Sequence, residues 1–183
     1  MKNKQAITLL FIANIISGFA QGISMLAIPW YFADILGMSS TYAKGYALLT
    51  FISLFWSLYS GTLVDRYSRK KLFLYSNLAC SIIIGTAAFY GITNNHTPWI
   101  LALAVFGTTM FHYSIHYPNL YAFGQEITEK ENYGKLNSYI EIQGQSTSIF
   151  AGAFAAILLS GTENKVMNLM GLNIPLPFDI IPW

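Results

Sequence analysis

The longest stretch without a Lys, Arg, Asp or Glu residue runs from Lys71 to Glu126, and two shorter ones precede Asp34 and Asp65. Crossing the ~30 Å hydrocarbon core of a bilayer takes ~20 helical residues. The long stretch therefore has room for two crossings and each shorter stretch for one. Only 10% of the 183 residues are charged and 54% are apolar, whereas about a quarter of a soluble domain is charged. The sequence thus predicts a membrane protein and argues against a soluble enzyme or a nucleic-acid-binding domain.

The apolar stretches predict an all-α polytopic membrane protein with five transmembrane helices. The polar segment 93–98, which ends in Pro98, has the composition of a short turn and divides the long stretch into two spans. A further apolar stretch follows the charged segment 126–135. The predicted spans cover residues 7–32, 45–64, 72–93, 99–123 and 136–160, so the membrane bundle occupies residues 1–160.

Positive charge is distributed unequally between the two sides of this predicted bundle. When the loops are assigned to alternate sides, all of the 10 Lys and Arg residues except Lys44 and Lys165 fall on the side of the N-terminus. Cytoplasmic loops carry an excess of Lys and Arg. We therefore expect a multi-pass protein of the cell (inner or plasma) membrane whose N-terminus is cytoplasmic.

The segment 161–183 is apolar, but its prolines are incompatible with a continuous helical span. We expect it to be an extracytoplasmic loop that lies along the membrane interface and leads to a sixth span outside this sequence. Five spans are an odd number. We therefore expect the chain to be a fragment whose C-terminal half lies either in the same polypeptide or in a separate one.

The segment that joins the second and third predicted spans, residues 61–71, reads GTLVDRYSRKK. Four basic residues would by themselves hold this loop in the cytoplasm, with no special spacing. The spacing of Gly61, Asp65, Arg66 and Arg69, however, resembles motif A of the major facilitator superfamily, written G-x-L-a-D-R-x-G-R-[RK]-[RK]. Ser68 stands where that motif has its second glycine. The resemblance covers the whole chain as five of the six helices of the family's N-terminal half.

The resemblance implies a role for each matching residue. Gly61 would let its helix approach a neighbour closely, as small residues do in membranes. Asp65 would cap a helix of the other half of the transporter, where the N-terminal helix dipole favours an anion. Arg66 and Arg69 would complete a cytoplasmic charge network that holds one conformation closed. The implied activity is transport by alternating access, without enzymatic chemistry and without a cofactor.

A second, local resemblance concerns the loop 125–137, which is similar to the link between helices four and five in the macrolide and siderophore exporter branch of the family. The fourth span has no arginine of the kind found in motif B, and the fifth has no Gly-Pro pair of motif C. The similarity to the exporter branch, together with the aromatic content of the spans, predicts proton-coupled efflux of small amphipathic or hydrophobic compounds. Import of a small polar solute by the same fold is one alternative, and a non-transporting membrane scaffold or truncated remnant is another.

Polar side chains within the spans are expected to face a protein interior or a water-filled cavity, because exposure to lipid is costly. In the family, helices one, two, four and five line the central cavity. For the second span, whose polar stripe consists of Thr50, Ser53, Ser57 and Ser60, we favour packing through small polar residues over cavity lining. The predicted lining residues are Asn14, Gln21, Met25, Tyr113, Gln145 and Ser148.

Glu141 is the only formally charged residue inside a predicted span, and His112 and His116 are the only histidines there. With a rise of 1.5 Å per residue, the three lie at a similar depth on consecutive antiparallel helices. Because histidine titrates near neutral pH, they form a candidate proton-coupling site. Glu141 could instead extend to the cytoplasmic interface, and each histidine could be neutral and bonded to a carbonyl. Two histidines are too few ligands for a metal site.

Overall fold

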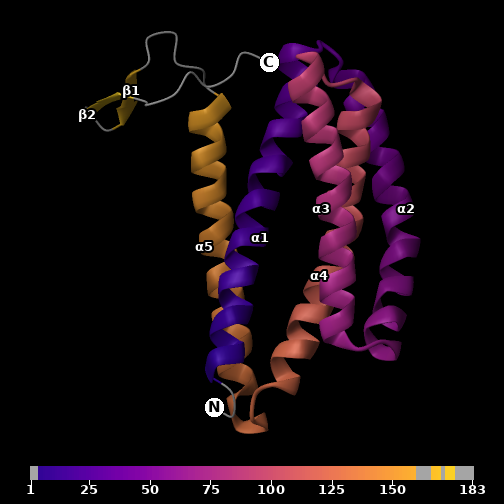
Figure 1. Ribbon diagram of the computed structural model, residues 1–183, viewed down its shortest axis with the longest axis vertical. Helices are drawn as coiled ribbons and strands as arrows, with labels where there is room; N and C mark the ends of the chain where they lie inside the picture. The colour runs from indigo at the N-terminus through magenta and orange to yellow at the C-terminus, as the bar shows by residue number, and fades with distance from the viewer. Residues whose placement is uncertain (1–3, 160–165, 170–171, 176–183) are drawn as a thin grey trace.

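The computed structural model describes residues 4–159, 166–169 and 172–175, which form five long helices and one short strand pair (Figure 1). Each long helix covers all or most of one of the five predicted spans, so the predicted helical bundle is confirmed. The helices are α1 (Lys4–Trp30), α2 (Ser39–Arg66), α3 (Arg69–Asn94), α4 (Trp99–Glu126) and α5 (Tyr133–Leu159). A π-helical turn, η1 (Tyr31–Ile35), extends α1, and a 3-10 turn, η2 (Lys130–Asn132), precedes α5.

The strands β1 (Val166–Leu169) and β2 (Leu172–Pro175) pair in antiparallel register, with Val166 opposite Pro175 and Leu169 opposite Leu172. They lie in the segment 161–183, for which the sequence predicted only an interfacial loop. Four-residue strands are too short for alternation of polar and apolar residues to identify them. The rest of that prediction concerns residues outside the described part of the chain.

Four of the helices, α1 with η1, α2, α3 and α5 with η2, are long and apolar enough to cross a membrane. Helix α4, which is 28 residues long like α2, is not among these four and carries polar residues such as His116 and Asn119. Both of these side chains are buried against other helices. Polar groups inside a membrane are tolerated when they face protein. Helix α4, which packs against α1, α2, α3 and α5, is therefore the interior helix of the bundle.

The helices form two groups that α4 connects. Helix α1 packs along α5, while α2 and α3 each pack along α4 (Figure 1). Toward its C-terminal end, α4 also approaches α1 and α5, while Phe123 and Glu126 keep contacts with the start of α3. The N-terminus, the α2–α3 loop and the α4–α5 loop all lie at one end of the bundle. We call this the basic end, since its loops and the adjoining helix ends contain Arg66, Arg69, Lys70, Lys71, Lys130 and Lys135.

A proline inside α4 explains one of its contacts with α2. Pro118 has no N–H, so the carbonyl of Ser114 lacks its usual helical donor. The Ser60 hydroxyl of α2 lies 3.0 Å from that carbonyl and shares its proton with the carbonyl of Ser57. Ser60 is only 1% exposed. The polar stripe of α2 thus packs against α4 at this level, in line with the packing interpretation of the second span.

An apolar cluster closes the space between α1, α4 and α5 near the basic end. It consists of Leu10, Leu120, Leu136 and Ile140, all of which are buried. Apolar burial of this kind excludes water from the contact between helices. On each of the three helices, the polar residues described next lie beyond this cluster, on the side away from the basic end.

Candidate functional site

A cavity of about 390 Å³ lies between α1, α4 and α5, beyond the apolar cluster. No Lys, Arg, Asp or Glu is among its lining residues. Of the six residues predicted to line a cavity, five do so, namely Asn14, Gln21, Met25, Tyr113 and Ser148. The remaining lining residues are Gly18, Gly22, Leu26, His116, Tyr117, Gln143, Gly144, Thr147 and Gly152.

Gln145 is the predicted lining residue that the structure places elsewhere. Its side chain is exposed, and Gln143 faces the cavity from α5. Successive helical residues are rotated by about 100°, so side chains two positions apart, such as those of Gln143 and Gln145, face nearly opposite directions. Gln143 and Thr147 also line the cavity, and neither was among the predicted lining residues. The signal that could have found them is the small-residue pair Gly18 and Gly22 on α1, which marks a close approach of a second helix.

Four polar side chains form a hydrogen-bond chain across the three helices that surround the cavity. The Asn14 Oδ1 atom lies 2.9 Å from His116 Nε2, and because an amide oxygen only accepts, Nε2 carries the proton. Asn14 Nδ2 donates to Gln143 Oε1 at 2.7 Å. Gln143 Nε2 in turn donates to Thr147 Oγ1 at 3.3 Å. The chain thus links α4 to α1 and α1 to α5 through side chains alone.

His112 and His116 lie one turn apart on α4, with ring centroids 5.4 Å from each other. His116 faces the cavity between α1, α4 and α5, whereas His112 lines a separate cavity of about 440 Å³ between α2, α3 and α4. Among the described residues, His112 Nε2 and His116 Nδ1 are buried without a hydrogen-bond partner. The histidine pair therefore joins the walls of two cavities.

Glu141 lies on α5 and accepts a hydrogen bond from the Tyr121 hydroxyl of α4. The structure thus places Glu141 against a tyrosine, whereas the sequence predicted that it would lie in one site with the histidines. Ring contacts continue from Tyr121 to Tyr117, at 6.5 Å between centroids, and from Tyr117 to His116, at 5.9 Å. Glu141 and the histidines are consequently connected through two tyrosines on α4.

The α2–α3 loop carries the residues that resemble motif A. Asp65 and Arg66 are exposed at the end of α2, and neither side chain has a hydrogen bond or ion pair within the described part of the chain. A Cβ atom added to Gly61 would meet no described atom within 4 Å. Ser68 has φ −59° and ψ 119°, which any residue adopts, so the absence of glycine at this position costs nothing.

Arg69, at the start of α3, is fixed to α4 in two ways. Its Nη1 atom lies 3.0 Å from Glu126 Oε2 in an ion pair. Its carbonyl oxygen accepts a hydrogen bond of 3.0 Å from Asn119 Nδ2, whose side chain is fully buried. The exposed ion pair contributes little stability, whereas the buried amide positions the loop. The structure therefore separates Arg69, which has partners within the bundle, from Asp65 and Arg66.

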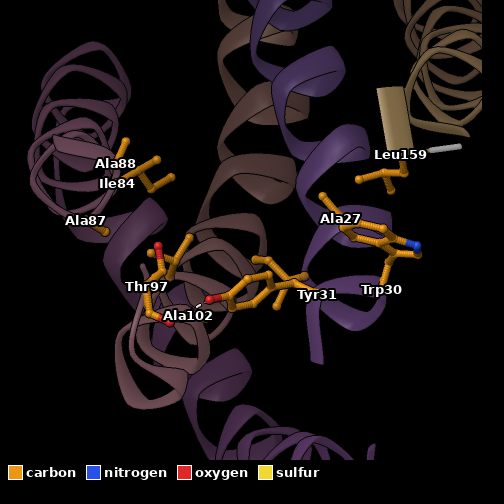
Figure 2. A pocket seen from close by; sticks show the side chains of 11 residues that line it. Ala27, Trp30, Tyr31, Ile84, Ala87, Ala88, Thr97, Ala102 and Leu159 are labelled. Atoms are coloured by element: carbon orange, nitrogen blue, oxygen red, sulfur yellow. Dashed lines mark hydrogen bonds between the residues drawn. The ribbon is translucent and has the colours of Figure 1, made fainter. Parts of the chain in front are cut away.

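A third cavity, of about 180 Å³, lies at the end of the bundle opposite the basic end. Figure 2 shows the Tyr31 ring in this cavity, with its hydroxyl pointing at the backbone of Thr97, to which it donates at 2.7 Å. The remaining lining residues are almost entirely apolar and come from α1, α3, α4 and α5. Seven of these lining residues can be followed in Figure 2, namely Ala27, Trp30, Ile84, Ala87, Ala88, Ala102 and Leu159.

Comparison with known families bears directly on this arrangement. The family model of the Major Facilitator Superfamily matches residues 10–169, which include most of α1 and all of α2 to α5. No match was found among curated proteins or among solved structures. The matched range contains both the loop that resembles motif A and the cavity between α1, α4 and α5. The chain is therefore a multi-pass membrane protein that belongs to the Major Facilitator Superfamily of membrane transporters.

Proposed function

We propose that this chain is the N-terminal half of a secondary transporter that exports small amphipathic or hydrophobic compounds in exchange for protons by alternating access. The observation that carries the proposal is the cavity of about 390 Å³ between α1, α4 and α5. Its walls combine amides, hydroxyls and aromatic rings, as binding sites for small molecules do. The second half of the transporter, in the same chain or a separate one, would supply the opposite wall.

The proposal also assigns a membrane orientation to the bundle and a role to each motif A residue. The excess of Lys and Arg at the basic end favours a cytoplasmic location for that end in the cell membrane. We assign to Asp65 and Arg66 a contact with the second half, because their exposed side chains have no described partner. The open face at Gly61 allows a helix of that half to approach closely. Breaking and re-forming this contact would alternate the access to the cavity.

Proton coupling is assigned to Glu141, His112 and His116. Tyr121 donates to Glu141, and ring contacts through Tyr117 lead from Tyr121 to His116. The titratable side chains in ring contact with His116 are His112 and Tyr117. A proton taken up at Glu141 or at a histidine would change the charge of this layer and bias the bundle toward one conformation.

Substituting Glu141 by glutamine is expected to abolish coupling while leaving passive movement of substrate. Proteoliposomes that contain the full chain hold 4-methylumbelliferyl β-glucoside, an uncharged amphipathic probe, at the same concentration inside and outside. The outside is made one pH unit more acidic, and equal potassium on both sides with valinomycin holds the membrane potential at zero. One pH unit corresponds to about a tenfold concentration ratio for one-to-one exchange. The unaltered protein should expel the probe until its external concentration is about ten times the internal one. The Glu141→Gln variant should leave the probe at equal concentrations inside and outside.

Glu131→Gln is the matched control, because Glu131 is exposed in η2 and lies far along the chain from the cavity-lining residues. It should behave as the unaltered protein does. Uphill export by Glu141→Gln would refute the assigned coupling residue. Uphill movement into the vesicles would indicate an importer, and no movement of the probe by the unaltered chain would contradict transport and favour a scaffold.

A further inference from the structure

The wall that this chain contributes to the cavity contains no Lys, Arg, Asp or Glu. Burying an ionised group without an opposite charge is expensive. The carboxylate of Glu141 on α5 accepts a hydrogen bond from the Tyr121 hydroxyl, and Glu141 is not among the lining residues. A ligand seated against this wall is therefore most favourable when it carries no charge.

Two buried polar atoms of the lining residues have no hydrogen-bond partner among the described residues. One is Gln21 Nε2 on α1, and the other is His116 Nδ1 on α4. Buried polar groups are nearly always paired, so an unpaired one in a cavity indicates a partner that comes from outside the chain. The amides of Asn14 and Gln143, by contrast, are already engaged with His116, Thr147 and each other.

The two unpaired atoms need opposite partners. Gln21 Nε2 is a donor and requires an acceptor. His116 carries its proton on Nε2, which donates to Asn14, so its Nδ1 atom offers a lone pair and requires a donor. Hydroxyl and amide groups both donate and accept, whereas a carboxylate only accepts and an ammonium only donates. The chemistry of the pair thus selects hydroxyl or amide groups.

An aromatic surface lies beside these atoms. The rings of Tyr113 and Tyr117 on α4 have centroids 4.3 Å apart, and both residues line the cavity. Gly144 of α5 faces the Tyr117 hydroxyl, because a Cβ atom there would lie 3.3 Å from it. The glycine lets the Tyr117 hydroxyl approach the backbone of α5 closely. Flat apolar groups pack favourably on such rings.

We infer that the cavity binds an uncharged amphipathic substrate whose hydroxyl or amide groups bond Gln21 and His116 while a flat apolar portion packs on Tyr113 and Tyr117. The inference rests on the proposed transport function and specifies its substrate class. It excludes organic cations and carboxylates as preferred substrates of this wall.

Binding of three matched probes to the purified full chain, measured by equilibrium dialysis in detergent, tests this inference. The probes are the β-glucoside, β-glucuronide and 6-amino-6-deoxy-β-glucoside of 4-methylumbelliferone, which are uncharged, anionic and cationic at neutral pH. The glucoside should bind about tenfold more tightly than either charged probe. Gln21→Leu should weaken glucoside binding about fivefold, as loss of one net hydrogen bond does. Gln5→Leu, on the exposed start of the same helix, should leave binding unchanged.

Equal or tighter binding of a charged probe, unchanged binding by Gln21→Leu, or no binding of the glucoside would each overturn the inferred substrate class. The proposed function fails separately. Selective binding of the glucoside without movement in proteoliposomes would contradict transport and leave the inferred site intact. Movement of the glucoside together with equal binding of all three probes would uphold transport and refute the selectivity for uncharged substrates.

Discussion

Replacing Gly22 by alanine should lower the free energy of unfolding of the bundle in detergent micelles by about 2 kcal/mol, the usual scale of an overpacked core. A Cβ atom at this position would lie 2.6 Å from the Cβ atom of Ala151. Neither atom can swing aside, since each is attached directly to a helix backbone. Helices α1 and α5 would have to separate along the most extensive helix pairing of the described bundle.

A second substitution distinguishes this clash from a general effect of removing a glycine. Ala151→Gly in the Gly22→Ala background transfers the methyl group from one helix to the other and should restore most of the lost stability. Gly85→Ala on α3 is the control, because a Cβ atom there would meet no described atom within 4 Å. Equal destabilisation by Gly85→Ala, or no recovery in the double variant, would contradict the close packing of α1 on α5.

Asn14→Leu should cost about 2 to 4 kcal/mol of stability and abolish transport of the probe. The amide of Asn14 bonds both His116 on α4 and Gln143 on α5. Leucine would leave His116 Nε2 and Gln143 Oε1 without these partners, and each unsatisfied buried group costs about 1–3 kcal/mol. Thermal unfolding in micelles and efflux from proteoliposomes measure the two effects.

Asn94→Leu provides the matched comparison, because Asn94 is exposed at the end of α3 and bonds only its local neighbours. It should change stability by less than about 0.5 kcal/mol. Adding His116→Leu to Asn14→Leu should cost less than the sum of the two single changes, since both partners of one buried bond are then removed. Strict additivity would show that Asn14 and His116 do not depend on each other.

The positions of the helices could be predicted because a bilayer requires long apolar segments, and the charge-free stretches leave few alternatives. The helices extend beyond the predicted spans where polar residues continue them, as α2 does from Ser39 to Gly45. Hydropathy identifies the segment in contact with lipid rather than the full helix. It also undervalues α4, whose polar residues such as His116 and Asn119 are buried by other helices.

The cavity could be predicted only in part, because depth along a helix follows from the sequence while rotation about its axis depends on packing. Asn14, Gln21 and Ser148 are polar residues in apolar helices and have few other places to face. On α5, the predicted Gln145 lies about one turn from Glu141, and both side chains are exposed. Gln143, which was not predicted, faces the cavity instead. Glu141 meets Tyr121, which lies more than one turn along α4 from His116, so the equal depth expected from the sequence does not bring the carboxylate to the histidines.

The central claim is that the cavity between α1, α4 and α5 is reached alternately from the two sides of the membrane. Ser148→Cys, with Cys80 replaced by alanine so that no other thiol remains, places a label site in the cavity wall. A membrane-impermeant maleimide, applied to vesicles of either orientation, should label this cysteine from both sides. Adding Asp65→Asn should increase labelling from the cytoplasmic side. Labelling from one side only, with rates that Asp65→Asn leaves unchanged, would contradict the claim.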